Sequence, residues 1–560
     1  MNRFRSFWVI IFFVLLSSFS FPSLAQASTS YITLVHPLRS QEQISNQKNL
    51  DEFLEMVQQE QIASTWLLQY ENLLDLPIVY KLKTLPTNQE VGLFMEVSEK
   101  FATDALVPYL VGDGDYYRAD KVLLSGYSIE DRKRLIDRAF FVFRKVFGKN
   151  PTAVGAWYID AFSLAYMQEK YSVKAALVVS DQFKTDGYGI WGQPWGTPFT
   201  PKFLNSLLPS GVEESDSNNI VITQWAARDP VHGYGSEVFD STYSVQANDY
   251  RGHHNLSSSY FFHLARSYLD SENFIHQLTI GLEVGQEGTT YLPELKKQIA
   301  IIKGGMFTNT PKFVTMSEFA AFYNVAKGNT TKNFLITGED FQDGKMRAWW
   351  FSTAVYRIGI LKDDHRVYIR DLRQYTDRPF PDLLRGDRKF PLSRIIPACI
   401  DELNSGNRFM LSENVKDVTV KRDGEKVFLS FYEELGDTVT VELGTNYIKM
   451  NNRRISLIPR PSLKNSVVRF LYKVYIQAKL RNPEQFQAGL RFTTLHDQTI
   501  FGVMAEPETL VGFSTRFPFL GVFHFPFQVL ARFKTLPSVS PTAFVLSKFI
   551  NWPDPCTIQI

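Results

Sequence analysis

The stretch GAWYIDAFSLAYMQEKYSVKAALVVSDQ, residues 155–182, has the pattern of a strand, a helix and a second strand. Two short apolar runs flank AFSLAYMQEKY, whose apolar side chains recur at helical spacing. Asp160 stands directly before this helix, and Asp181 directly follows the second strand. Aspartate is a common helix N-cap, but a carboxylate at the end of a buried strand is also a candidate for chemistry. The rest of the chain is needed to decide whether these aspartates are helix caps or functional groups.

The same alternation extends from residue 31 to about residue 325. The predicted strands are YITLVHP, ASTWLLQYE, EVGLFMEVS, TAVGAWYID, AALVVSD, NIVITQWA, QLTIGLEVG and KFVTM. Helical patterns separate them, among them a capped helix that starts on Ser128 and ends on Gly148. Such alternation predicts βα units around a parallel sheet. About seven or eight units fit a closed (β/α)7–8 barrel. An open doubly wound sheet is the alternative, although no glycine-rich phosphate loop follows the first strand.

Beyond about residue 330 the pattern changes to short strands separated by Asp, Gly and Asn, as in KVFLSFYEE and DTVTVELG. Helical periodicity is scarce there, which predicts a mostly antiparallel β-sandwich. The expected division is therefore a βα barrel over residues 28–328 and a β-rich domain over residues 329–560. A chain of 560 residues has room for both.

The first 27 residues, MNRFRSFWVIIFFVLLSSFSFPSLAQA, have the form of a secretory signal peptide. Arg3 and Arg5 precede an apolar core, and Ala25 and Ala27 form a small-x-small cleavage site. We therefore expect a secreted or cell-envelope protein with no membrane span after cleavage, an uncleaved anchor being the alternative. Cys399 and Cys556 could pair in an exported protein, but their spacing does not decide it.

Charge and motif content bear on partners. The net charge is +2, so no strong field for nucleic acid is present and no such partner is predicted. No His-x-x-x-His pair occurs, and two lone cysteines do not make a metal site. No metal and no other cofactor is predicted, although His36 with distant carboxylates remains a weak alternative.

Polar side chains stand at or just after many predicted strand ends. Barrel active sites lie at the C-terminal ends of the strands, so these residues are expected to share one rim. Clustered carboxylates raise one another's proton affinity, as acid–base chemistry requires. Each residue singly could instead be structural. The set is His36, Glu71, Glu96, Asp160, Asp181, Asp229 and Glu283.

Two loops add candidates. The loop after the fifth strand carries Trp191 and Trp195 among glycines and prolines. Their rings either tuck into the barrel top or form a platform for sugar rings. The segment QWAARDPVHGYG places His232 close to Asp229, beyond what a turn needs. Strand alternation would put Tyr158 and Asp160 on one side and direct Trp157 towards the helices.

The strings GLFMEVS, GAWYID, DQFKTDGYGIWG, QWAARDPVHGYG and VTMSEFAAFY resemble a secreted branch of the glycoside hydrolase/deacetylase superfamily of barrels. The resemblance covers residues 31–325. Polysaccharide deacetylases use an Asp pair after the first strand and a His-x-x-x-His motif, where this chain has His36 and Glu96. Family 57 hydrolases use a Glu after the fourth strand and an Asp after the seventh, where this chain has Asp160 and Glu283. The resemblance therefore implies a two-carboxylate mechanism with the two residue types exchanged.

These patterns predict a secreted carbohydrate-active protein that hydrolyses a glycosidic bond in an envelope or extracellular polysaccharide. Asp160 and Glu283 are the predicted catalytic pair. The alternatives are a non-catalytic glycan-binding protein on the same barrel and a metal-dependent polysaccharide deacetylase that uses His36. The residues predicted to bind the polysaccharide or oligosaccharide are His36, Glu71, Glu96, Tyr158, Asp181, Trp191, Trp195, Asp229 and His232.

Overall fold

The computed structural model describes residues 29–450 apart from short gaps, and only four two- to four-residue strands after that. The gaps are 41–42, 110–117, 184–188, 203–204, 212–218, 236, 238, 331, 376–395, 397 and 407. The predicted signal peptide lies outside the described residues. Cys399 is disulfide-bonded, and Cys556, predicted as a pairing candidate, also lies outside them.

A parallel sheet of eight strands forms the first part of the described chain. Seven strands run in the order β6-β5-β4-β3-β2-β1-β7, and β8 pairs with the start of β1. The neighbours are all parallel, as βα units require. The strands are β1 (Ser30–Leu38), β2 (Ser64–Leu68), β3 (Gln89–Phe94), β4 (Ala153–Gly155), β5 (Ala175–Val179), β6 (Val221–Trp225), β7 (His276–Gly281) and β8 (Lys312–Val314).

The sheet curls into a nearly closed barrel, and side chains bridge the seam between β6 and β7. The indole of Trp225, the last residue of β6, donates to Gln246 at 3.0 Å. Gln246 in turn donates to Glu287, just after β7, at 3.0 and 3.1 Å. Glu287 also accepts the backbone N–H of Glu283 at 3.0 Å. The seam is therefore closed by hydrogen bonds that end beside a predicted catalytic residue.

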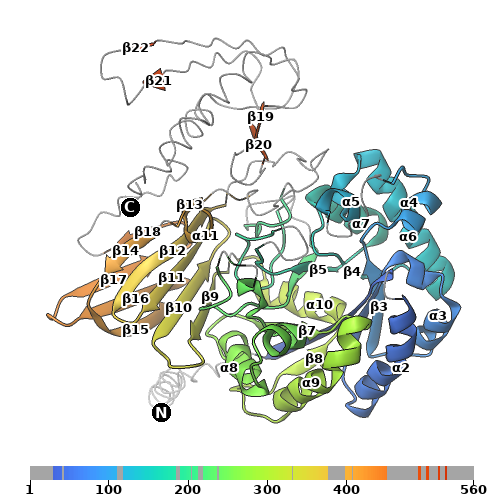
Figure 1. The fold of residues 1–560 in the computed structure, drawn as a ribbon, viewed down its shortest axis with the longest axis horizontal. Helices are drawn as coiled ribbons and strands as arrows, with labels where there is room; N and C mark the ends of the chain where they lie inside the picture. The colour runs from blue at the N-terminus through green and yellow to red at the C-terminus, as the bar shows by residue number, and fades with distance from the viewer. Residues whose placement is uncertain are drawn as a thin grey trace, which may run out of the picture.

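Helices surround the sheet, and their ends follow local sequence signals (Figure 1). The helix predicted between Ser128 and Gly148 is confirmed: Ser128 caps it by accepting from Asp131 N at 3.1 Å, and Gly148 ends it at φ 77°. The last barrel helix opens on a capping box formed by Thr315 and Glu318. The principal helices are α2 (Gln43–Gln59), α3 (Leu76–Lys83), α4 (Glu99–Asp104), α6 (Ile129–Phe147), α7 (Ala161–Tyr171), α8 (Ser258–Leu269), α9 (Gln286–Lys303) and α10 (Met316–Lys327). Within the described residues, none of the helices combines the length and the apolar character that crossing a bilayer requires.

The part of the chain from residue 334 to residue 450 is an antiparallel sandwich that lies beside the barrel (Figure 1). Its six-stranded sheet runs β13-β12-β11-β10-β9, with β14 also paired to β12. Its four-stranded sheet runs β15-β16-β17-β18. The strands are β9 (Phe334–Glu339), β10 (Met346–Ser352), β11 (Tyr356–Asp363), β12 (Arg366–Gln374), β13 (Ala398–Asp401), β14 (Phe409–Ser412), β15 (Val415–Asp423), β16 (Lys426–Glu433), β17 (Thr438–Leu443) and β18 (Ile448–Met450). The predicted barrel and sandwich are both confirmed.

The six-stranded sheet is buried on both faces. One face packs on the four-stranded sheet through residues such as Trp349 and Phe431. The other face, with Ile336, Trp350 and Tyr368, belongs to the same hydrophobic core as the barrel. Strand side chains alternate between faces, so adjacent residues such as Trp349 and Trp350 enter different cores. One face of the six-stranded sheet therefore shares a continuous apolar core with the barrel, while the interior between the two sandwich sheets is a separate core.

Candidate active site at the barrel mouth

Three charged side chains from different strands meet at the mouth of the barrel. Arg39 directly follows β1, Glu96 follows β3 and Glu283 follows β7. Arg39 donates to Glu96 Oε2 from Nη2 at 2.8 Å and from Nε at 3.2 Å, and to Glu283 Oε1 from Nη1 at 3.2 Å. The three side chains are at most 9% exposed. They form a buried group of one guanidinium and two carboxyl groups, which we call the Arg39 trio.

The trio exists because β7 lies directly against β1. Gly281 pairs with Val35, and a Cβ on Gly281 would stand 1.8 Å from the Val35 carbonyl oxygen. Only glycine permits this approach. Glu283, two residues later, then reaches the side chain that follows β1. Asn46 fixes the Arg39 backbone from the helix side by donating to its carbonyl at 2.8 Å.

Aromatic rings line the barrel interior beside the trio. The Arg39 guanidinium lies 5.5 Å from the Trp157 ring centroid, within cation–π range. Trp157 also meets Phe94 of β3 at 5.2 Å and Trp225 of β6 at 6.0 Å. The prediction that Trp157 faces the helices is therefore wrong. Strand β4 ends at Gly155, so strand alternation does not extend to the residues that follow.

Further polar groups, buried or half-buried, lie next to the trio. Glu71 accepts hydrogen bonds from the hydroxyls of Ser40 and Ser98. Gln69 accepts from Ser40 N at 2.7 Å and donates to the Glu96 carbonyl at 3.3 Å. Of the predicted residues, the structure thus brings Glu71, Glu96 and Glu283 into one region. It adds Arg39, Ser40, Gln69 and Ser98, which the sequence analysis missed although several stand directly after strands.

Asp160 has a different set of partners. It caps α7 by accepting from Ser163 N at 3.0 Å and from Ser163 Oγ at 2.7 Å. It also accepts from Arg132 of α6 at 3.0 Å. Arg132 is itself buried and donates to the carbonyls of Ser125 and Tyr127. Asp160 is therefore both a helix cap and the counter-ion of an arginine other than Arg39.

His36 is enclosed between the barrel and its helices. Its ring centroid is 5.0 Å from that of Phe53 on α2 and 4.6 Å from that of Trp66 on β2. Burial lowers the pKa of His36 to about 3. In the described part of the chain, no three His, Cys, Asp or Glu residues are grouped so that they could hold a metal ion.

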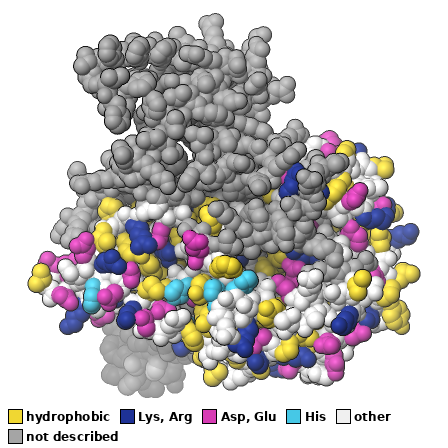
Figure 2. Space-filling view, in the orientation of Figure 1, with side chains coloured by type: hydrophobic (Ala, Val, Ile, Leu, Met, Phe, Trp, Pro, Cys, Tyr) yellow, Lys and Arg dark blue, Asp and Glu magenta, His cyan; other side chains and the backbone are white. Residues whose placement is uncertain are grey.

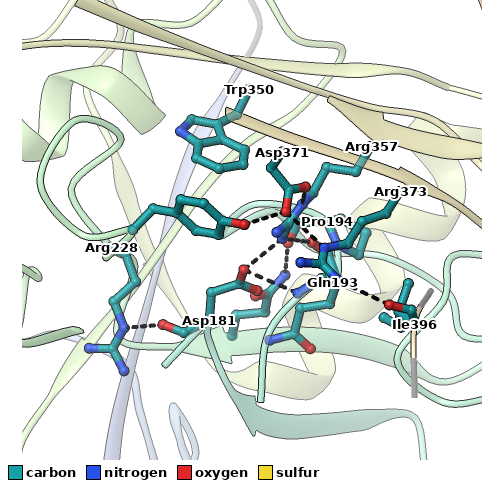
Figure 3. Close-up of polar contacts among 12 residues, drawn as sticks. Asp181, Gln193, Pro194, Arg228, Trp350, Arg357, Asp371, Arg373 and Ile396 are labelled. Carbon is teal, nitrogen blue, oxygen red and sulfur yellow. Dashed lines mark hydrogen bonds and ion pairs between the residues drawn. The ribbon is translucent and has the colours of Figure 1, made fainter. Parts of the chain in front are cut away.

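Asp181 lies beneath the six-stranded sheet, in a buried charge network (Figure 3). Arg357 of β11 donates from Nη1 to Asp181 at 2.7 Å and from Nε to Asp371 of β12 at 2.9 Å. Burial raises the pKa of Asp181 despite its arginine. The pKa of Asp371 is also raised by burial, but Arg357 and Arg373 outweigh this and hold it below its usual value.

The two loop tryptophans are buried in the same region. Trp195 stacks on Trp350 of β10 with centroids 4.0 Å apart and planes at 8°. Trp191 is 2% exposed and lies 5.1 Å from Phe183. Of the two roles considered for these rings, the structure supports packing into the interior and not an exposed platform, because the six-stranded sheet covers them.

The remaining predicted residues lie around the loop after β6 and beside Asp160. Asp229 accepts from Val231 N at 2.8 Å and from the Tyr260 hydroxyl at 3.0 Å, which shapes that loop. His232 lies 2.9 Å from Asp340, just after β9. Tyr158 is buried, with 8% of its surface exposed.

No family model matches the chain, and no curated protein matches it. Several solved structures are similar, including the following three. A candidate glycoside hydrolase/deacetylase from Parabacteroides distasonis has a TM-score of 0.49 at 16% identity, over 63% of this chain and 86% of that one. A candidate polysaccharide deacetylase from Mycobacterium smegmatis has 0.33 at 9%, over 55% and 93%. The peptidoglycan N-acetylglucosamine deacetylase Bc1960 has 0.27 at 13%, over 52% and 87%. Such values carry no argument about function, which rests on the residues of the mouth.

Proposed function

We propose that the protein is an exported, carbohydrate-active hydrolase that cleaves a glycosidic bond of an envelope or extracellular polysaccharide at the barrel mouth. The observation that carries the proposal is the Arg39 trio, in which Glu96 and Glu283 from different strands share one guanidinium. Two carboxyl groups are what glycosidic hydrolysis requires. Export is inferred from residues 1–27 of the sequence.

The composition of the trio suits this chemistry, because it places two carboxyl groups beside one guanidinium. A group with one protonated and one ionised carboxyl has both partners of the reaction. The protonated carboxyl donates its proton to the leaving oxygen, and the ionised one stabilises or attacks the positively charged anomeric carbon. Trp157 supplies an aromatic wall beside the group.

The second carboxylate is assigned to Glu96. The sequence pairs Glu283 with Asp160, but Asp160 is bonded to Arg132 and to the start of α7. Glu96 shares Arg39 with Glu283 and is buried with it. We therefore assign Asp160 a positioning role, since it holds the segment that carries Trp157.

The test is to incubate the mature protein with a panel of polysaccharides and to measure hydrolysis as the release of reducing ends. Glu283→Gln and Glu96→Gln should each lower turnover by about 10²–10⁴-fold, because each removes one acid–base partner without changing shape. The matched control is Glu99→Gln, an exposed glutamate at the start of α4, which should keep wild-type turnover. Glycan affinity, measured by calorimetry, should survive in both mouth variants.

Other outcomes assign the alternatives. Release of acetate without new reducing ends would show a deacetylase. Binding of a glycan that is never cleaved, unchanged in both mouth variants, would show a glycan-binding protein. Either result removes the assignment of Glu96 and Glu283 as a catalytic pair.

A further inference from the structure

A group of rings lies on the surface next to the mouth, on the segment between β6 and α8. It consists of Phe239, Tyr243, His253 and His254, which we call the aromatic–histidine surface. Phe239 is 59% exposed. Tyr243 and His254 are half-buried and His253 is exposed. Figure 2 shows histidine side chains in a row across this face of the molecule, among hydrophobic ones.

The rings are held in fixed positions. Tyr243 stacks on His254 with centroids 3.6 Å apart and planes at 21°. The Nε2 atom of His254 lies 2.8 Å from Thr242 Oγ1. The ring centroids of Phe239 and His253 lie 5.6 Å apart. Rings fixed in this way lose little conformational freedom when a ligand covers them.

The same segment is bonded to the mouth. Asn248, between Tyr243 and His253, donates to Glu287 at 2.6 Å. Glu287 accepts the backbone N–H of Glu283, a member of the Arg39 trio. The aromatic–histidine surface and the trio are therefore parts of one connected structure, on the side of the barrel where β6 and β7 meet.

We infer that the aromatic–histidine surface binds saccharide units of the polysaccharide beyond the bond at the mouth; this rests on the proposed function. Sugars present apolar C–H faces and a rim of hydroxyls. The surface offers both counterparts, because aromatic faces alternate with imidazoles that donate or accept hydrogen bonds. Asp240 adds an acceptor at its edge, and His232 adds a further imidazole, whose ring centroid lies 5.2 Å from that of Tyr243. An exposed group of rings of this kind usually marks a binding site.

The test measures affinity for the polysaccharide of the same panel that the wild type binds most tightly, by calorimetry in the Glu283→Gln background so that the ligand is not cleaved. Phe239→Ala and His253→Ala should each weaken affinity about 3- to 10-fold, the range that one ring contact supplies. The matched control is Phe141→Ala, because Phe141 is 50% exposed on α6, outside this surface. It should bind as the Glu283→Gln protein does.

The outcomes separate this inference from the proposed function. Unchanged affinity in both variants, or an equal loss in Phe141→Ala, overturns the saccharide surface while hydrolysis by the wild type stands. If both variants bind the glycan more weakly but the wild type never cleaves it, the saccharide-binding role of the surface is supported and the proposed hydrolysis is overturned. A wild type that binds no polysaccharide of the panel overturns both.

Discussion

At the scale of single residues, His36 shows how position along a strand decides the role of a side chain. It precedes Arg39 by three residues, yet Arg39 reaches the mouth while His36 packs between Phe53 and Trp66. In that apolar enclosure the charged imidazolium is costly, and its pKa of about 3 reflects this. The ring is therefore neutral at the pH where the mouth would act.

This gives a prediction for stability against pH. The pKa of His36 is about 3 in the fold and about 6.5 in the unfolded chain. Between these values the unfolded chain binds the extra proton, so His36 makes stability fall by about 1.4 kcal/mol for each pH unit of acidification. His36→Leu should remove this contribution. Urea unfolding at pH 7, 6, 5 and 4 measures it.

The control for this prediction is His365→Leu, because the ring of His365 is mostly exposed. That variant should keep the wild-type slope of unfolding free energy against pH. A wild-type slope in His36→Leu as well would mean that the ring is protonated as readily in the fold as outside it.

At the scale of elements, the start of α7 links two helices through one carboxylate. Asp160 satisfies the first turn of α7 and also binds Arg132 of α6. Arg132 keeps two backbone carbonyls as partners in any Asp160 variant. The two functions of the carboxylate can therefore be separated by substitution.

Asp160→Asn keeps an oxygen for the cap but loses the negative charge, whereas Asp160→Ala loses both. Both variants should be less stable than wild type, by about 3 kcal/mol, because each breaks the buried ion pair between Asp160 and Arg132. Asp160→Ala should be a further 1 kcal/mol or so less stable, the usual contribution of a cap. Chemical denaturation measures both differences. The control is Asp51→Asn, which removes an exposed ion pair with Lys81 and should change stability by under about 1 kcal/mol. Equal stability of the two Asp160 variants would show that the cap contributes nothing.

At the scale of the whole molecule, the six-stranded sheet covers and bonds the barrel loops that follow β5 and β6. Trp350 donates from its indole to the Pro230 carbonyl at 2.8 Å. Arg370 of β12 donates to the carbonyls of Val231 and Tyr234 in the same loop. Arg357 supplies the counter-ion of Asp181. Without the sheet, aromatic rings and a carboxylate in the loops after β5 and β6, which are now buried, would be exposed to water.

We therefore predict that a fragment of residues 29–330 does not fold as a stable unit, whereas residues 29–450 do. The shorter fragment should bind a hydrophobic dye and unfold without cooperativity, because it exposes the apolar face now covered by β9–β12. Size-exclusion chromatography and circular dichroism compare the two. Cooperative unfolding of the shorter fragment would instead favour the independent units 28–328 and 329–560 expected from sequence.

Much of the fold could be predicted because its signals are local. The ends of α6 follow from Ser128 and Gly148, and those of α10 from a capping box. Alternating strand and helix patterns gave the barrel, and their loss near residue 330 matches the passage from α10 to β9. One extrapolation was wrong: the pattern TAVGAWYID continues to Asp160, but β4 ends at Gly155 because pairing to both neighbours stops there.

The sequence by itself determined the order of elements, the barrel and the sandwich, because capping and periodicity act within a few residues. It also determined that carboxylates follow many strands. Only the tertiary structure decided which of them meet. Glu96 and Glu283 join through Arg39 because β7 can approach β1 at Gly281. Asp181 pairs with Arg357, 176 residues away along the chain. Such partners depend on strand register and on what covers each loop, and neither is written in local sequence.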